Sequence, residues 1–405
     1  MPLRILHVIQ TVNPKSGGPI EGVCQQARAH TIFNHSVEIV SLDKPNSRYL
    51  AFPGINVFPC DSSKIDRIFP LTLLKWLKSN HHHYDCIIVN GIWGLHIYVA
   101  WLALARTKTP YCIFIHGMLD PWFKNKFPLK HLKKWLAWPW AIYPALRDAD
   151  RVFFTCEQER LLARKSFWLY DCNETVISFG TEGIPNPHQD YKTNFIANHP
   201  SLTGKRIFLF LGRVHPKKGA ELLIISLAKL HRMGLWEPGN MKLVFAGPND
   251  NLYASKLSSL SAKLGVSNLI YWTGMLSGNQ KWGAFQSAEA FVLPSHQENF
   301  GIAVAEALSC GVPVLISRAV NIANEIESDK AGLVEPDNLK GTSQLFYRWL
   351  ALSTTEKTNM GIAARQCFKN RYHSSLTSTS ITKNLYLALL ERNLPPSQGQ
   401  ITVQG

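Results

Sequence analysis

Short apolar runs alternate with amphipathic stretches along almost the whole chain, and this alternation restricts the possible folds more than any other feature. The apolar runs are residues 5–9, 37–41, 86–89, 111–115 and 151–155 in the first half, and 207–211, 242–246, 269–272, 291–293 and 312–316 in the second. Apolar strands followed by amphipathic helices are typical of parallel sheets that helices cover on both faces. The sequence therefore predicts an α/β protein with two parallel sheets.

The length of 405 residues exceeds what one hydrophobic core usually supports, so two domains are expected. Residues 181–204 are rich in Pro, Asn and His with little periodicity, which predicts a linker. We expect a Rossmann-like domain over 1–180 and a second over 205–370. A helix within 371–393 is expected to pack back on the first domain, and 394–405 to form a loose tail. Ligands of such sheets bind beyond the carboxyl ends of the strands, so two facing domains predict a cleft between them.

Charge and cysteine content narrow the classes of partner. The formal net charge of +15 favours an anionic partner, such as nucleic acid, an anionic membrane or a phosphorylated small molecule. Motifs typical of nucleic-acid binding are lacking from the sequence, so nucleic acid is disfavoured. The eight cysteines are scattered without a Cys-x-x-Cys pair, which disfavours disulfides and zinc. No apolar run has the length of a membrane-spanning helix, and the start does not resemble a secretory signal, so we expect a cytoplasmic protein.

The most informative motif is SHQENFGIAVAEALSCGVPV, over residues 295–314. A helix beginning near Phe300 presents free N–H groups and a partial positive charge, which suit a diphosphate, and Gly301 lets a ligand come close. Glu298 precedes this helix and Glu306 lies within it, on the order of 12 Å away at the rise of an α-helix. A nucleotide sugar has a similar span, so Glu306 is predicted to bind ribose and Glu298 to face the sugar. The alternative is that Glu298 is only a charge at the start of the helix and that Glu306 is a solvated or salt-bridged helix residue.

A second motif, LFLGRVHPKKG over residues 209–219, combines a strand end with Arg213, Lys217 and Lys218. Departure of a nucleoside diphosphate builds negative charge on phosphate, and fixed cations stabilise that charge. An arginine can hold two phosphate oxygens at once. Arg213 and Lys218 are therefore candidates for diphosphate binding and catalysis, and the alternative is a solvated basic loop.

Together these motifs resemble the retaining glycosyltransferases of family 4, and the resemblance extends over nearly the whole chain. It implies the GT-B architecture, with two Rossmann-like domains facing each other across a cleft. It also implies a nucleoside-diphosphate-sugar donor, no essential metal or other cofactor, and retention of the anomeric configuration. The donor-binding residues that it implies in the second domain are Arg213, Lys218, Glu298, Asn299, Phe300, Gly301 and Glu306.

The resemblance includes the first domain. Gly17 and Gly18 match a glycine loop that approaches donor phosphates, and His116 matches a catalytic His-Gly segment near the anomeric carbon. Taken alone, His116 reads more simply as a structural histidine at a strand end. Met275 lies where the family packs the nucleotide base, with purine and pyrimidine both possible.

Basic and aromatic residues alternate in 121–147 without any acidic residue. Such mixing favours a membrane interface, where cations meet anionic headgroups and aromatic rings lie at the boundary. The alternative is that the aromatic rings are core and the lysines merely exposed. The candidate interface residues are Trp122, Lys124, Lys126, Lys130, Lys133, Lys134 and Trp135.

The expected activity is transfer of a sugar to a hydroxyl of a glycan or lipid-linked glycan acceptor, at the cytoplasmic face of a membrane, in polysaccharide or cell-envelope glycan synthesis. Two alternatives remain open. One is a sugar-nucleotide epimerase on the same architecture, and the other is a noncatalytic membrane-surface scaffold. The sequence leaves open the sugar, the nucleotide, the acceptor and the oligomeric state.

Overall fold

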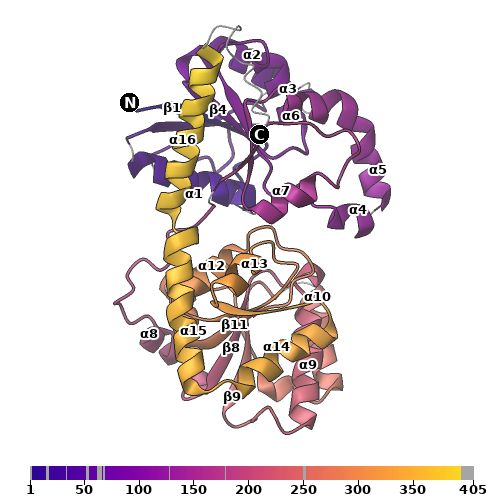
Figure 1. Ribbon diagram of the computed structural model, residues 1–405, viewed down its shortest axis with the longest axis vertical. Coiled ribbons are helices and arrows are strands. Elements are labelled where there is room, and N and C mark those ends of the chain that lie inside the picture. Colours follow the sequence, from indigo (N-terminus) through magenta and orange to yellow (C-terminus); the bar gives the residue numbers. More distant parts are fainter. Residues whose placement is uncertain are drawn as a thin grey trace, which may run out of the picture. The chain divides into compact units, whose positions relative to one another are not determined.

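The computed structural model describes residues 2–14, 18–32, 34–51, 54–61, 66, 69–126, 128–177, 179–249 and 252–393. The chain divides into two compact units, which Figure 1 shows: Met1–Phe179 with Ser374–Gly405, and Gly180–His373. Each unit contains one parallel sheet with helices on its faces. The predicted α/β class with two parallel sheets is confirmed.

The sheet of the first unit has seven strands in the order β3-β2-β1-β4-β5-β6-β7. The strands are β1 (Arg4–Ile9), β2 (Ser36–Ser41), β3 (Asn56–Pro59), β4 (Cys86–Asn90), β5 (Tyr111–Phe114), β6 (Arg151–Phe154) and β7 (Glu174–Val176). Every residue of β4, β5 and β6 is buried, because helices cover both faces. All five strands predicted in this half are present, whereas the two edge strands were not predicted.

Helices of the first unit connect these strands. They are α1 (Gly18–Ile32), α2 (Leu71–Asn80), η2 (His81–His83), α3 (Leu95–Leu104), α4 (Trp122–Lys126), α5 (Pro128–Ala137), η3 (Trp138–Ile142), α6 (Tyr143–Arg147), α7 (Glu157–Ala163) and α16 (Ser374–Asn393). The last helix packs against α1, and Arg392 forms an ion pair of 2.6 Å with Asp150. The segment 374–393 therefore belongs to the first unit, although it ends the described chain.

The sheet of the second unit has six strands in the order β10-β9-β8-β11-β12-β13. They are β8 (Arg206–Leu211), β9 (Met241–Ala246), β10 (Ile270–Gly274), β11 (Ala288–Leu293), β12 (Val314–Ser317) and β13 (Gly332–Glu335). The helices are α8 (Lys192–Asn198), η4 (Pro200–Leu202), η5 (Pro216–Lys218), α9 (Ala220–Arg232), α10 (Leu252–Lys263), η6 (Ser267–Leu269), α11 (Gly278–Ser287), α12 (Ile302–Ser309), α13 (Ala323–Ser328), α14 (Leu339–Ala351), α15 (Thr354–Cys367) and η7 (Phe368–Tyr372).

Residues 181–204, which we expected to be a linker, are folded into the second unit. They contain α8 and η4, and α8 packs against α11. Phe195 is fully buried, and a Cβ on Gly283 would come within 2.5 Å of the Cβ of Phe195. The glycine therefore allows the two helices to approach closely. The expected tail at 394–405 lies outside the described residues, and within them no helix combines the length and apolarity needed to span a bilayer.

Candidate active site

The loop after β8 presents Arg213 at the carboxyl end of the second sheet. Gly212 has a φ of +154°, and its carbonyl oxygen lies so near Gly247 that a Cβ there would be only 1.9 Å away. Only glycine allows this close approach of two backbone segments. Arg213 is exposed, and no ion pair joins it to another residue in the described part of the chain. Its guanidinium is thus available to an anionic ligand.

The loop after β8 is fastened to the loop after β11. The carbonyl oxygen of Lys217 accepts hydrogen bonds from His296 N at 2.8 Å and Ser295 Oγ at 3.0 Å. Gly219 has a φ of +65°, and a Cβ on it would lie 2.2 Å from the carbonyl oxygen of Pro294. These contacts fix Lys218 beside the loop that carries Glu298.

Lys218 and Glu298 form an ion pair in which both side chains are largely buried. Burial away from water, with repulsion from Lys217 and Arg213, lowers the pKa of Lys218 to about 7. The carboxylate opposes this shift because an opposite charge stabilises the ammonium form. Two residues that the sequence predicted separately as donor ligands are thus in direct contact.

The backbone of Glu298 is held by the loop after β12. Glu298 N donates to the Ala319 carbonyl oxygen, and Asn321 N donates to the Glu298 carbonyl oxygen, both at 3.0 Å. Gly301 caps α12 with a φ of +77°, and a Cβ on it would lie 3.2 Å from Cγ of Glu298. The free N–H groups at the start of α12, whose N-cap is Gly301, therefore lie only a few residues beyond Glu298.

Two of the predicted donor ligands beside Gly301 are turned to other contacts. The ring of Phe300 is buried and meets Tyr372 edge-on at a centroid distance of 5.5 Å, so it belongs to the core rather than to a ligand surface. The amide oxygen of Asn299 accepts a hydrogen bond of 3.4 Å from Asn321. Met275, beyond the end of β10, is exposed.

Glu306 is buried within α12 and forms an ion pair of 2.7 Å with Lys281. Lys281 comes from α11 and also lies 4.3 Å from the ring centre of Trp282. An ionised carboxylate accepts hydrogen bonds and donates none, so the pair keeps Glu306 suited to bind hydroxyl groups. Lys281 was missed in the sequence because it belongs to no motif and reaches Glu306 only through the packing of α11 on the sheet.

His116 lies just after β5 in the first unit, with a φ of +53°. The Asn90 amide nitrogen donates to the Ile88 carbonyl oxygen at 3.1 Å, which orients that amide. His116 Nε2 therefore donates to Asn90 Oδ1, also at 3.1 Å, and leaves a lone pair on Nδ1. The imidazole stacks on Phe114, and burial lowers its pKa to about 3, so it is neutral at physiological pH.

Helix α1 approaches His116 closely. A Cβ on Gly22 would lie 3.3 Å from Cε1 of His116, so a small residue is needed there. Gly18 is the first residue of α1, at the point where a glycine loop was predicted. Gly17 lies outside the described residues.

The predicted membrane-interface residues have different environments. Lys124, Lys126, Lys133 and Trp135 are exposed, and Trp122 is half-buried. Lys134 turns inward: its Nζ lies 4.1 Å from the ring centre of Trp93, and burial lowers its pKa. The side chain of Lys130 lies outside the described residues.

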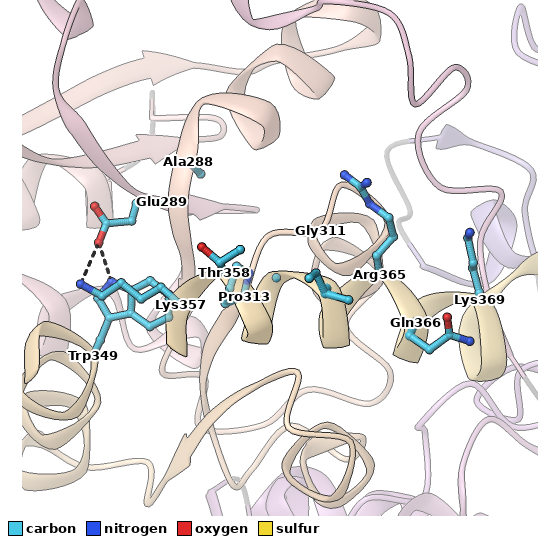
Figure 2. Close-up of a pocket in the computed structure, with 12 residues that line it drawn as sticks. Ala288, Glu289, Gly311, Pro313, Trp349, Lys357, Thr358, Arg365, Gln366 and Lys369 are labelled. Atoms are coloured by element: carbon cyan, nitrogen blue, oxygen red, sulfur yellow. Dashed lines mark hydrogen bonds and ion pairs between the residues drawn. The ribbon is translucent and has the colours of Figure 1, made fainter. Parts of the chain in front are cut away.

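A cavity of about 580 Å³, drawn in Figure 2, lies at the amino ends of β11 and β12 in the second unit. It is lined by the first residues of β11, by Pro313 before β12, and by Arg365 and Lys369. Glu289 accepts a hydrogen bond of 2.8 Å from Trp349 in this cavity. Since the strands are parallel, the loops that carry Arg213 and Glu298 lie at the carboxyl ends of the strands, on the far side of the sheet from this cavity. The cavity is therefore not the predicted donor site.

The structure thus brings five predicted residues to the carboxyl ends of the adjacent strands β8 and β11. These residues are Arg213, Lys218, Glu298, Gly301 and Glu306. Lys218 contacts Glu298, and the start of α12 lies between Glu298 and Glu306 along the chain. Such a set can bind a pyrophosphate flanked by two polyhydroxyl groups.

Comparisons with known proteins identify the family of the chain. Residues 192–366 match the family of glycosyl transferases group 1, and residues 17–178 match the glycosyl transferase 4-like domain. An uncharacterized glycosyltransferase of Methanocaldococcus jannaschii is 32% identical over 148 residues, which is 36% of each chain. The match thus spans about a third of that relative. The GDP-mannose:cellobiosyl-diphosphopolyprenol alpha-mannosyltransferase of Xanthomonas oryzae is 24% identical over 91% of this chain and 93% of its own.

Solved structures are similar over the whole fold. HepE of Anabaena, solved in complex with UDP-glucose, has a TM-score of 0.74 at 17% identity, and the match covers 95% of this chain and 100% of HepE. Sucrose-phosphate synthase of Thermosynechococcus elongatus has a TM-score of 0.74 at 18% identity, over 96% of this chain and 99% of its own. The predicted GT-B architecture is confirmed. The chain belongs to the group 1 glycosyltransferases of the family 4 type.

Proposed function

We propose that this chain is a retaining glycosyltransferase that moves a sugar from a nucleoside-diphosphate-sugar to a hydroxyl of a glycan or lipid-linked glycan acceptor, in polysaccharide or cell-envelope glycan synthesis. The observation that carries the proposal is the contact of Lys218 with Glu298, next to the free guanidinium of Arg213 and the start of α12. In this arrangement a diphosphate replaces Glu298 as the counter-charge of Lys218. Glu298 then becomes available to the hydroxyls of the donor sugar.

The chemistry follows from where charge develops. As the bond between the anomeric carbon and the phosphate oxygen breaks, negative charge grows on the diphosphate, and Arg213, Lys218 and the start of α12 stabilise it. The acceptor oxygen forms its bond to the anomeric carbon on the same face, and its proton passes to the leaving phosphate oxygen. Glu306 holds the ribose hydroxyls. His116, which is neutral, orients the sugar through hydrogen bonding rather than through charge.

Names of the relatives support a nucleotide-sugar donor without deciding the base. HepE is described in complex with UDP-glucose, whereas the Xanthomonas oryzae relative is described as using GDP-mannose. The latter name also includes a diphosphopolyprenol acceptor, which supports a lipid-linked glycan for this chain. The proposed base site lies beside Met275, which is exposed beyond β10.

Calorimetric titration with UDP, GDP and ADP, followed by NMR of the product formed from the sugar of the nucleotide that binds, tests the proposal. We expect saturable binding of one nucleotide and a product that keeps the donor's anomeric configuration. Glu298→Ala is expected to lower kcat by roughly 100-fold or more, whereas Glu327→Ala, which removes an exposed carboxylate paired with Arg318, leaves it unchanged. An inverted product, full activity of Glu298→Ala, or epimerisation of the nucleotide sugar without any acceptor would refute it.

A further inference from the structure

Three leucines on α5 form an exposed apolar row in the first unit. Leu129, Leu132 and Leu136 are 80%, 58% and 65% exposed. Their spacing of three and four residues places them on one face of the helix. Soluble monomeric proteins rarely expose a continuous apolar surface of this kind without a partner.

Exposed tryptophans add to the apolar surface of this row. Trp135 and Trp140 are exposed, and Trp168, from the segment after α7, is 69% exposed. The rings of Trp135 and Trp168 lie 6.1 Å apart between centroids. The apolar surface therefore spans two separate segments of the chain.

The opposite side of α5 is anchored to the unit, so the leucine row has a fixed outward direction. His131 contacts the ring of Phe167 at a centroid distance of 4.7 Å, and Lys134 lies over Trp93. The main neighbours of α5 are α4 and η3, and Figure 1 shows α4 and α5 at the margin of the first unit. Turning the leucines inward would break both anchoring contacts.

Positive charge accompanies the apolar row. Lys124, Lys126 and Lys133 are exposed, and residues 121–147 contain no Asp or Glu. Exposed lysines of α4 and α5 beside the leucines and tryptophans match the depth profile of an anionic bilayer, with phosphates outside and acyl chains below. An acidic protein partner would match the lysines but would not account for the leucine row.

We propose that α5 docks this protein on an anionic membrane surface, with Leu129, Leu132 and Leu136 inserted at the boundary between headgroups and acyl chains. The exposed lysines contact lipid phosphates, and the tryptophans lie at the interface. This surface differs from the sequence-based candidate set, because the leucines perform the insertion and Lys134 faces inward. Docking goes beyond the proposed function and does not depend on which sugar is transferred.

Sedimentation with vesicles tests this surface. The protein is expected to bind vesicles containing phosphatidylglycerol and to bind phosphatidylcholine vesicles at least tenfold more weakly. The triple variant Leu129→Gln, Leu132→Gln, Leu136→Gln is expected to lose roughly tenfold or more of the affinity for the anionic vesicles. Its nucleoside-diphosphate affinity is expected to match that of the parent protein, which separates this test from that of the proposed function.

A matched control uses three leucine or isoleucine side chains of similar exposure elsewhere. Leu252, Ile362 and Leu390 are 75%, 66% and 62% exposed, and their replacement by glutamine should leave vesicle binding unchanged. Equal losses in the two triple variants, or undiminished binding of the α5 variant, would overturn the proposal. Concentration-dependent self-association that the α5 variant abolishes, without vesicle binding by the parent protein, would also overturn it and assign the surface to a second copy of the chain.

Discussion

Lys218 is the cation of the candidate site whose pKa is shifted furthest from its usual value. It is largely buried, lies near Arg213 and Lys217, and contacts the carboxylate of Glu298. A buried ammonium group is stable only while an anion is close to it, so exchange of Glu298 for a diphosphate keeps the lysine paired throughout. The sequence predicted each of these residues from its motif, but could not show that the lysine and the glutamate meet.

Replacement of Lys218 should therefore affect donor binding far more than replacement of its neighbour. Lys218→Met is expected to lower kcat/KM by about 100-fold or more, since a fixed cation is lost where charge develops. Lys217→Met should change kcat/KM by only a few-fold, because Lys217 fastens the loop through its backbone carbonyl oxygen. Steady-state kinetics on both variants provide the measurement, and equal losses would contradict the assigned role.

The lowered pKa of Lys218 predicts a pH dependence of diphosphate affinity. Above pH 7 the free protein holds more of this lysine as the neutral amine, whereas the bound diphosphate requires the ammonium form. Affinity should thus fall as pH rises above about 7, by up to tenfold per pH unit, with uptake of about one proton on binding. Calorimetry in buffers of different ionisation enthalpy measures this uptake. Its absence at pH 8, or its persistence in Lys218→Met, would contradict the prediction.

The central strands were predictable, whereas three of the four edge strands, β3, β7 and β13, were not. Strands such as β4 and β12 are largely apolar runs because they are covered on both faces, whereas β3 and β7 are short, half-exposed and mixed in composition. The start of α12 was also predictable, because Gly301 and the residues around it form one local motif. By contrast, α8 is only seven residues long, and its place in the fold depends on Phe195 packing beside Gly283. Lys281 and the outward leucine row on α5 likewise depend on tertiary packing.

Gly301 is expected to matter more than other glycines with the same backbone conformation. Gly301 and Gly204 have φ values of +77° and +71°, but a Cβ has open space at Gly204 and lies 3.1 Å from Val304 at Gly301. Alanine at either position should cost about 1–2 kcal/mol of stability because of the left-handed backbone. Only Gly301→Ala should also weaken nucleoside-diphosphate binding, since it displaces the start of α12. Urea unfolding and calorimetry compare the two variants, and equal effects on binding would refute this role of Gly301.

At the scale of the whole molecule, the two units differ in the burial and in the pKa values of their histidines. His7, His30 and His96 are fully buried in the first unit, and burial lowers their pKa values to about 3, 3 and 4, respectively. In the second unit, burial lowers the pKa values of His199 and His215 as well, whereas contacts with Glu221 and Asp337 raise the pKa of His296. The sequence showed the two-unit α/β architecture, but no local pattern distinguishes a buried neutral histidine from a paired one.

The first unit should consequently be the more sensitive to acid. Between pH 6.5 and pH 3 to 4, these buried histidines are protonated in the unfolded form but neutral in the folded form. Each of them therefore lowers the stability by up to about 1.4 kcal/mol per pH unit as the pH falls through this range. The raised pKa of His296 has the opposite sign and favours the folded second unit at low pH. Hydrogen exchange at pH 7 and pH 5 should show larger losses of protection in β1 and α1 than in β8 and α9. Uniform loss across both units would contradict this difference.

The most direct test of the central claim is a crystal structure with the nucleoside diphosphate that binds. We expect its phosphate oxygens within hydrogen-bonding distance of Arg213, Lys218 and the first N–H groups of α12, with the ribose hydroxyls on Glu306. Binding of the diphosphate at the amino ends of the strands, in the cavity beside Arg365 and Lys369, would contradict the account.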